Sequence, residues 1–442
     1  MLTETEKLPF HARRHWEKAC EMYRKTELKN GIRIISERLD HFRSVSLGIW
    51  VGTGSRDEKE KQNGISHFIE HMIFKGTQNR SSLRIAKELD MIGGLSNAFT
   101  GKEYTCFHSK VLDKHFPALA DILSDIFLNS NFDPQEIDRE RQVILQELNM
   151  LEDAPDEYIH ELFHSLFWSN HPLGNPVLGS VETVTAIDRE TLLNYLKSTY
   201  IPERIIIAVA GSIEHDTVVG FFSPLFETMG QVEIPHHVNS PEIHADISCM
   251  YKDLEQVHLC LGGKAPHLSS EMRFAGAVLN TILGGNMSSR LFQEIREKRG
   301  LAYSVYSFLS AFMDTGLLGI CLGTEPKWVN QSLRIIHKEI DKIQNGAITE
   351  SDLNEAIEYL TGGILLGAEN SDSRMMRNAK NEYIFGRYIS YEELVQELEK
   401  VTIEDVIDCA REAFRRENVS LATLGPFTRD DLDMDNLRFA VA

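Results

Sequence analysis

The sequence has no long hydrophobic run, although 42% of its 442 residues are hydrophobic. A helix that crosses a membrane needs about 20 consecutive apolar residues, so we expect no membrane span. Residues 1–24 mix acidic and basic side chains and contain no apolar core, which argues against a secretory signal peptide. The chain is long enough for two domains, each with its own hydrophobic core.

Basic residues are also scarce relative to acidic ones, with 46 Lys and Arg against 66 Asp and Glu and a net charge of -20. A protein that binds nucleic acid neutralises phosphates with a basic surface. The charge balance therefore argues against nucleic acid as a partner, whereas an acidic surface attracts basic peptides.

Cysteine is sparse and shows no paired spacing. The six cysteines are Cys20, Cys106, Cys249, Cys260, Cys321 and Cys409. A disulfide framework or a cysteine-based metal site normally shows in the sequence as cysteines at regular, close spacing. We therefore expect reduced cysteines that bind no metal, in a cytoplasmic protein.

The most informative motif is Ser66–Phe74, which reads S-H-F-I-E-H-M-I-F. On a helix, His67 and His71 lie one turn apart and project from the same face, with Glu70 on the same side. Apolar residues fill the remaining positions, so the helix is predicted to be buried. Buried histidine and glutamate side chains are costly without partners, and a zinc ion with a bound water would supply those partners.

A catalytic zinc normally has three protein ligands, so the two histidines leave one ligand to be found elsewhere. The best candidate for that ligand lies in the predicted helix Glu140–Leu148, where Glu140 and Glu147 are two turns apart and share a face. We predict that Glu147 binds the zinc and that Glu140 braces the ligands. Taken singly, each feature also fits a surface helix with solvated charges, but the combination favours a metal site.

An internal repeat divides the chain. Ile187–Leu192 and Val209–Gly211 are echoed by Val401–Val406 and Thr423–Gly425, and the same offset along the chain separates both pairs of segments. The second copy has neither His nor Glu where the first has its H-x-x-E-H motif, so we predict one metal site per chain. The fold class expected is α+β, with two similar α/β domains whose mixed, mostly antiparallel sheets are flanked by helices.

The predicted divisions are an N-terminal extension (1–22), a catalytic zinc-binding domain (23–232), a linker (233–245) and an inactive repeat domain (246–442) that contributes to substrate binding.

These motifs resemble those of the pitrilysin superfamily of inverzincin zinc peptidases, especially the catalytic subunit of mitochondrial processing peptidase and its single-gene bacterial homologues. In that family the third ligand is a Glu about 75 residues after the second His, with a supporting Glu one heptad before it. Here Glu147 follows His71 by 76 positions, and Glu140 precedes Glu147 by seven. The resemblance runs from about Leu28 to Gly425, with Gln146 as one departure, where many relatives have Glu.

The resemblance implies roles for further residues. Glu70 would act as general base and stay free of the zinc. The family also uses an Arg and a Tyr seven residues apart in its second half, which approach the zinc as the halves close, and here Arg296 and Tyr303 match them. Tyr303 would donate to the oxyanion, and Arg296 would bind a substrate carbonyl or carboxylate.

The resemblance also implies a mode of substrate binding, in which the peptide adds a strand at Asn97 and Ala98. Glu157 and Glu161 lie one turn apart and would hold a basic side chain of the substrate, although a solvated acidic face explains them equally well. Family members enclose the substrate between two halves, each about the size of this chain. The chain would thus be half of a clamshell, in a homodimer or in a heterodimer with an inactive homologue.

The expected function is that of a zinc-dependent endopeptidase that processes peptides or unfolded segments inside a chamber. Two alternatives stay open. One is a non-catalytic scaffold or processing-enhancing subunit, and the other is a maturation protease dedicated to one modified peptide.

Overall fold

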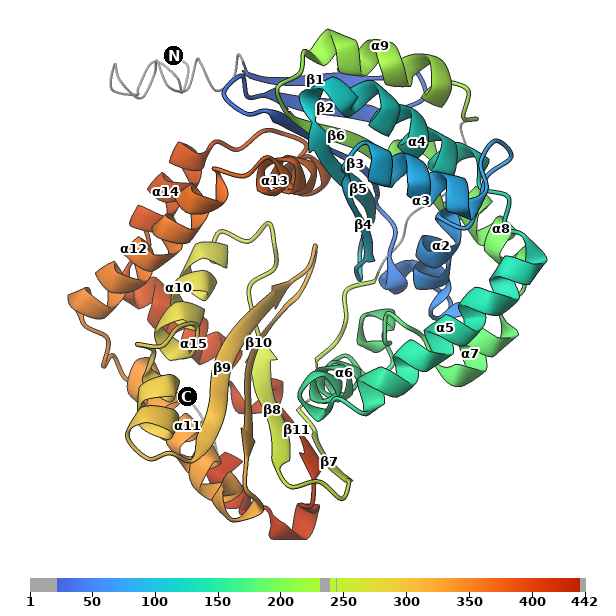
Figure 1. Cartoon of the computed structure of the whole chain (residues 1–442). Coiled ribbons are helices and arrows are strands. Elements are labelled where there is room, and N and C mark those ends of the chain that lie inside the picture. Colours follow the sequence, from blue (N-terminus) through green and yellow to red (C-terminus); the bar gives the residue numbers. More distant parts are fainter. Residues whose placement is uncertain (1–21, 231–238, 244, 438–442) are drawn as a thin grey trace, which may run out of the picture. The chain divides into compact units, whose positions relative to one another are not determined.

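Two β-sheets organise the chain, each in its own compact unit. The computed structural model describes residues 22–230, 239–243 and 245–437 (Figure 1). The predicted N-terminal extension apart from Met22, a large part of the predicted linker, and Cys20 lie outside the described residues. Among the described residues, the first unit takes those within the segments Met1–Glu147, Val177–His237 and Leu365–Glu393, and the second takes those within Leu148–Pro176, Val238–Ile364 and Leu394–Ala442.

The first unit is built on a six-stranded sheet with the order β1-β2-β6-β3-β5-β4. The strands are β1 (Tyr23–Glu27), β2 (Arg33–Arg38), β3 (Ser44–Val51), β4 (Leu95–Thr100), β5 (Thr105–Leu112) and β6 (Ile205–Gly211). Neighbours run antiparallel except β2 and β6, which are parallel. The central strands β3 and β6 are almost wholly buried, as their continuous apolar runs predict.

Helices of the first unit carry the candidate site and cover the sheet. They are α2 (Ile65–Ile73), α3 (Ser82–Met91), α4 (Phe116–Asn129), α5 (Pro134–Glu152, which continues into the second unit), α7 (Val181–Ala186), α8 (Arg189–Thr199), α9 (His215–Phe226) and α13 (Ser371–Phe385).

The second unit contains a five-stranded sheet with the order β7-β11-β8-β10-β9. Its strands are β7 (Ile247–Tyr251), β8 (Val257–Lys264), β9 (Ala302–Ala311), β10 (Gly316–Thr324) and β11 (Ser420–Gly425). Its helices are α6 (Pro155–Phe167), α10 (Arg273–Leu283), a π-helix (Phe292–Glu297), α11 (Val329–Gln344), α12 (Glu350–Gly367), α14 (Tyr391–Glu399) and α15 (Ile403–Ala413), with α12 and α14 reaching across the unit boundary.

The two sheets share one topology. Without β1, the order β2-β6-β3-β5-β4 corresponds strand by strand to β7-β11-β8-β10-β9, and the single parallel pair occupies the same place in both. The helices follow the same rule, since α5, which begins at Pro134, corresponds to α12, which begins at Glu350. The prediction of two similar α/β domains with mixed, mainly antiparallel sheets is confirmed.

Two equivalent helices are exchanged between the copies. Helix α6 begins at Pro155 and α13 begins at Ser371, and this interval equals the one between the starts of α5 and α12, so α6 and α13 hold the same place in the repeat. Yet α13 packs on β3 and β6 of the first sheet, and α6 packs on β8 and β11 of the second. Met375 of α13 is fully buried and accepts a 3.5 Å hydrogen bond at Sδ from the indole Nε1 of Trp50. Each compact unit therefore takes one helix from the other copy, whereas the predicted domain bounds stay predictions.

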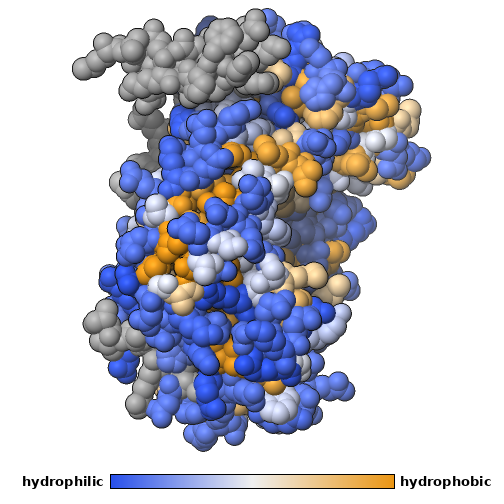
Figure 2. Space-filling view, turned by 90° about the vertical axis from the view of Figure 1, so that its left-hand side faces the viewer, coloured by the Kyte–Doolittle hydropathy of each residue, from blue (hydrophilic) through white to orange (hydrophobic). Residues whose placement is uncertain are grey.

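Hydrophilic residues cover most of the face seen in Figure 2, with hydrophobic residues in smaller groups between them. Within the described part of the chain, no helix is both long and apolar enough to cross a membrane.

Candidate metal centre

Three side chains from two helices of the first unit converge on one point. His67 and His71 lie one turn apart on α2, and Glu147 lies on α5. The Nε2 atoms of His67 and His71 are 3.7 and 3.5 Å from Oε2 of Glu147. One ligand atom from each residue lies within 4.8 Å of the other two. The structure thus brings together the three residues that the sequence predicts as ligands.

The separations suit a zinc ion. Zinc binds His nitrogen and carboxylate oxygen at about 2.0–2.2 Å, which puts neighbouring ligand atoms of a tetrahedron about 3.4 Å apart. Three protein ligands also leave the open fourth position of a catalytic site. Burial and the neighbouring His71 lower the pKa of His67 to about 3. Its ring is therefore neutral at pH 7, the form in which imidazole binds a metal.

Glu140 lies behind His71, where the sequence predicts a bracing residue. Its side chain is buried, and its Oε2 is 3.1 Å from Nδ1 of His71. Its other oxygen pairs with Lys75 Nζ at 2.7 Å. When Nδ1–H of His71 donates to this carboxylate, the Nε2 lone pair points toward Glu147 and is free for a metal. His67 has no such brace, because its buried Nδ1 lacks a hydrogen-bond partner among the described residues.

Glu70 stands beside the ligands without joining them. It lies on the same helix, but it is not part of the ligand cluster found in the described chain. Its Oε2 accepts a 2.6 Å hydrogen bond from Thr100 Oγ1 at the end of β4. Burial raises the pKa of Glu70, while the Thr100 bond and His71 act in the opposite direction. The sequence carries no signal for Thr100, because its role depends on β4 packing against α2.

Glu58 fixes the beginning of α2. It is 3% exposed. Its Oε1 accepts from the N–H of Ser66 at 2.8 Å, and its Oε2 accepts from the N–H of Gly64 at 2.7 Å and from Asn63 Nδ2 at 2.9 Å. The first N–H groups of a helix have no acceptor within the helix, and the N-cap residue Gly64, at φ 92°, has no side chain to cap them. Sequence reasoning missed Glu58 because it acts from an upstream loop and not from the N-cap position.

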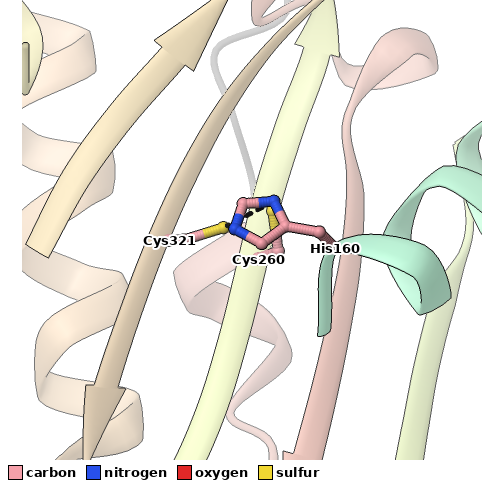
Figure 3. Close-up of side chains that lie close together, drawn as sticks. All are labelled: His160, Cys260 and Cys321. Atoms are coloured by element: carbon pink, nitrogen blue, oxygen red, sulfur yellow. Dashed lines mark hydrogen bonds between the residues drawn. The ribbon is translucent and has the colours of Figure 1, made fainter. Parts of the chain in front are cut away.

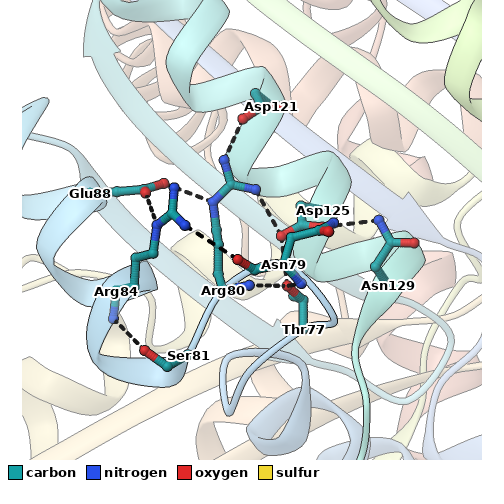
Figure 4. A network of polar contacts seen from close by, with 9 residues as sticks. All are labelled: Thr77, Asn79, Arg80, Ser81, Arg84, Glu88, Asp121, Asp125 and Asn129. Carbon is teal, nitrogen blue, oxygen red and sulfur yellow. Dashed lines mark hydrogen bonds and ion pairs between the residues drawn. The ribbon is translucent and has the colours of Figure 1, made fainter.

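The other end of α2 is fixed as well. Ser130 Oγ donates to the carbonyl of Ile73 at 2.9 Å. In the following loop, Thr77 Oγ1 and Arg80 Nη1 donate to buried Asp125 of α4 at 2.7 and 2.8 Å. Figure 4 shows the whole network, which also contains Asn79, Ser81, Arg84, Glu88, Asp121 and Asn129. The histidine rings are therefore carried by a helix that is anchored at both termini.

The predicted strand-addition site lies on an edge strand. Asn97 and Ala98 belong to β4, which is last in the sheet order and pairs only with β5 among the described strands. The N–H of Ala98 donates to Asn97 Oδ1 at 2.9 Å. An edge strand is the place where a peptide can extend a sheet, so the position suits the prediction without testing it.

The remaining predicted residues belong to the second unit. Arg296 lies in the last turn of the π-helix and Tyr303 is the second residue of β9, and the Arg296 guanidinium carbon is 5.0 Å from the Tyr303 ring centroid. Tyr303 is 82% exposed. Glu157 and Glu161 lie on α6, the first exposed and the second half-buried. The roles predicted for these four residues stay predictions.

Family models match most of the chain. A model described as insulinase (peptidase family M16) matches residues 33–181, and one described as the peptidase M16 inactive domain matches residues 186–360. The first range contains His67, His71 and Glu147, and the second covers much of the copy that lacks the motif.

Curated relatives and solved structures agree with these matches. The chain is 40% identical to the uncharacterized zinc protease YmxG of Bacillus subtilis, over 92% of this chain and 98% of that protein. It is 38% identical to an uncharacterized zinc protease of Streptomyces coelicolor, over 95% and 92% of the two chains. A protease from Helicobacter pylori superposes with a TM-score of 0.85 at 21% identity, covering 91% of this chain and 99% of that one. At that identity the structural likeness supports the fold alone.

The brace on His71 can be tested by exchanging Glu140 for Ala. Removing a hydrogen-bonded acceptor behind a metal-binding His typically lowers metal affinity about 10–100-fold. We expect a loss of that size in zinc affinity, measured by competition with a chromogenic chelator at pH 7. Glu136→Ala, on the same helix beside Arg139, is the matched control and should keep the original affinity. Equal affinities in the two variants would contradict the assignment.

The cap on α2 predicts a pH dependence of stability. Burial raises the pKa of Glu58 from 4.5 to about 7, against the opposing hydrogen bonds from Ser66 and Gly64. Between these values the folded state holds a proton that the unfolded state releases, so the free energy of unfolding falls as pH rises, by roughly 3 kcal/mol.

Thermal unfolding of the wild type and of Glu58→Gln between pH 4.5 and 8 measures this slope. The Gln side chain is neutral over this whole range, so Glu58→Gln should lack the contribution of Glu58 to the pH dependence of stability. Exposed Glu60→Gln should behave as the wild type. A slope that is unchanged in Glu58→Gln would show that the carboxyl stays charged when folded.

Proposed function

The chain belongs to peptidase family M16, and from that premise we propose that it is a zinc-dependent endopeptidase. The observation that carries the proposal is the convergence of His67, His71 and Glu147, with Glu70 next to the cluster but outside it. A site built only to hold a structural ion would close its fourth position with another protein ligand. Here Glu70, whose carboxylate is not part of the ligand cluster, lies on α2 with the two histidines.

A zinc ion held by His67, His71 and Glu147 would supply a Lewis acid that polarises the scissile carbonyl and acidifies a water. Glu70 takes the proton of the attacking water and returns it to the leaving amine. Thr100 Oγ1 donates to Oε2 of Glu70, which orients the carboxylate and leaves Oε1 for the proton. The burial that raises the pKa of Glu70 brings it closer to neutral pH, where a general base works best.

Substrates in this proposal are peptides or unfolded segments in extended conformation. An extended peptide pairs with the free edge of β4 at Asn97 and Ala98 through main-chain hydrogen bonds. The exposed phenol of Tyr303 and the guanidinium of Arg296 supply donors to substrate carbonyls. The net charge of -20, with Glu157 and Glu161 as local contributors, favours basic peptides.

The proposal includes an enclosing homodimer, which sedimentation velocity of the full chain tests directly. A chain that stays monomeric while cleaving peptides would overturn this part. A heterodimer with an inactive homologue is the variant to test if the isolated chain is monomeric and inactive.

Two other functions are separable by experiment. A scaffold or processing-enhancing subunit has no need for a metal, and the convergent ligand set argues against it. A maturation protease dedicated to one modified peptide would have the same site and would differ only in its substrates. A random peptide library incubated with and without a chelator identifies a general peptidase, because only that protein yields chelator-sensitive cuts in unmodified peptides. If the library stays intact, the zinc content separates the other two cases, because a dedicated protease binds zinc stoichiometrically and a scaffold does not.

Glu70→Gln tests the general base. Glutamine keeps the shape of the side chain but cannot take a proton, and general bases typically contribute about 10²–10⁴-fold to the rate. We expect kcat for peptide hydrolysis to fall by that factor while the zinc content stays at the wild-type value, measured by elemental analysis of the same sample. Exposed Glu27→Gln should leave both values unchanged. Full activity in Glu70→Gln would exclude this role for Glu70.

Tyr303→Phe tests the proposed oxyanion donor. Removing one such donor typically lowers kcat about 10²–10³-fold, because the hydrogen bond strengthens only in the transition state. We expect the loss in kcat with little change in KM, and no change in zinc content. Tyr359→Phe, another exposed tyrosine of the second unit, is the control. A change confined to KM would assign Tyr303 to ground-state binding.

A further inference from the structure

We propose that His160, Cys260 and Cys321 form a second metal site, in the second unit, for a thiophilic cation of the Zn²⁺ or Cu⁺ class. Their three ligand atoms lie within 4.8 Å of one another, and Figure 3 shows the imidazole next to both sulfur atoms. The site shares no residue with the cluster of His67, His71 and Glu147, and it does not depend on the proposed peptidase activity.

The sheet aligns the two thiols. Cys260 on β8 and Cys321 on β10 are direct partners in the antiparallel ladder, so their side chains lie on the same face of the sheet. Both residues are buried, with exposed fractions of 0% and 3%. Helix α6 packs against this sheet and contributes His160, whose Nδ1 is 4.0 Å from Sγ of Cys321.

A neighbouring tyrosine sets the state of the imidazole. Tyr306 on β9 is paired with Cys321 across the next ladder, and its Oη lies 2.7 Å from Nε2 of His160. When Nε2–H donates to this oxygen, the lone pair of Nδ1 points toward the sulfur atoms. Metal-binding histidines are normally fixed in this way, by a hydrogen bond from the ring nitrogen that does not bind the metal.

The donor set selects the kind of cation. Two thiolates and one imidazole are soft and borderline ligands that suit Zn²⁺ and Cu⁺ and discriminate against Mg²⁺ and Ca²⁺. Zinc–sulfur and zinc–nitrogen bonds of about 2.3 and 2.1 Å put neighbouring ligand atoms of a tetrahedron about 3.6–3.8 Å apart. The observed 4.0 Å between Nδ1 of His160 and Sγ of Cys321 needs only a small adjustment of either side chain.

The surroundings give the site a structural role. Cys260 and Cys321 belong to a hydrophobic cluster in which Phe163 and Phe167 of α6 pack on the sheet. An ion bound at this contact would link α6, which comes from the first copy, to the sheet of the second copy. Because such an ion binds only the folded arrangement, it would stabilise the exchanged helix by mass action.

The proposal reverses the expectation that cysteine spacing alone supports, namely that no cysteine binds metal. Cys260 and Cys321 are far apart in the sequence, and His160 lies farther upstream still. No short-range spacing connects them, since only the pairing of β8 with β10 and the exchange of α6 bring them together.

Cobalt titration of the full-length chain, freed of metal and kept reduced under anaerobic conditions, tests the proposal. Thiolate-to-cobalt charge transfer gives near-ultraviolet absorption that a site of nitrogen and oxygen ligands cannot produce. In Glu147→Gln, which removes a ligand of the first site, we expect this band to saturate at one Co²⁺ per chain. The band should also persist in Cys249→Ser, which removes a cysteine on β7 outside the cluster.

Three variants probe the site itself. Cys260→Ser combined with Cys321→Ser should abolish the band. His160→Gln, which keeps both thiols and guards against misfolding of the double variant, should weaken Co²⁺ binding at least about tenfold. Tyr306→Phe should weaken it about 10–100-fold. Displacement of bound Co²⁺ by Zn²⁺ in one arm and by Cu⁺ in the other then identifies which cation binds more tightly.

Three results would overturn the proposal. One is the absence of a thiolate band although thiol titration shows both cysteines reduced. Another is a band that survives the double serine variant. The third is a purified chain in which Cys260 and Cys321 form a disulfide, and in which the two cysteines still bind no Co²⁺ after the disulfide is reduced.

Discussion

The structure of the first unit depends on bringing two imidazoles and a carboxylate, all partly buried, to a single point. Uncompensated polar groups in such a place cost several kcal/mol, and α2 otherwise presents buried apolar residues such as Phe68 and Ile69. Because His67, His71 and Glu147 converge, a metal ion bound at that point would give each of the three groups a partner. Glu140 and Thr100 each pair with a polar group that a metal would leave unpaired. Glu140 lies next to Nδ1 of His71, and Thr100 donates to Glu70.

Rigidity around this point comes from elements that the ligands never touch. Glu58 supplies the acceptors at the beginning of α2, and Ser130 with the Asp125 network holds its end. A metal site needs its ligands held to within a fraction of an ångström, and a nine-residue helix alone could not provide that. The sheet contributes too, because β4 brings Thr100 to Glu70 and exposes its own free edge within the same unit.

Much of this could be predicted from the sequence, because local periodicity determines it. The i, i+4 spacing of His67 and His71 and the two-turn spacing of Glu140 and Glu147 place side chains on helix faces without tertiary information. The apolar run Ser44–Val51 coincides with β3, and the offset between the copies anticipated their common topology. The pairing of the two helices through Glu147 was a hypothesis that the family resemblance supported, since spacing alone cannot bring α5 to α2.

What the sequence could not predict depends on contacts between distant segments. In the sequence, Glu58 is one of several acidic residues in a predicted loop. Only its buried contacts with Gly64 and Ser66 show that it caps the beginning of α2. The exchange of α6 and α13 leaves no trace in periodicity, because a helix with an apolar face can pack on either sheet. The cluster of Cys260, Cys321 and His160 follows from that exchange, which explains why cysteine spacing suggested that no cysteine binds metal.

Anomalous diffraction at the zinc edge from zinc-loaded crystals would show whether His67, His71 and Glu147 bind one cation. We expect an anomalous peak bonded to Nε2 of both histidines and to a carboxylate oxygen of Glu147, with Glu70 outside bonding distance. A zinc-loaded crystal with no peak at this point, or with Glu147 turned away from both imidazoles, would contradict it.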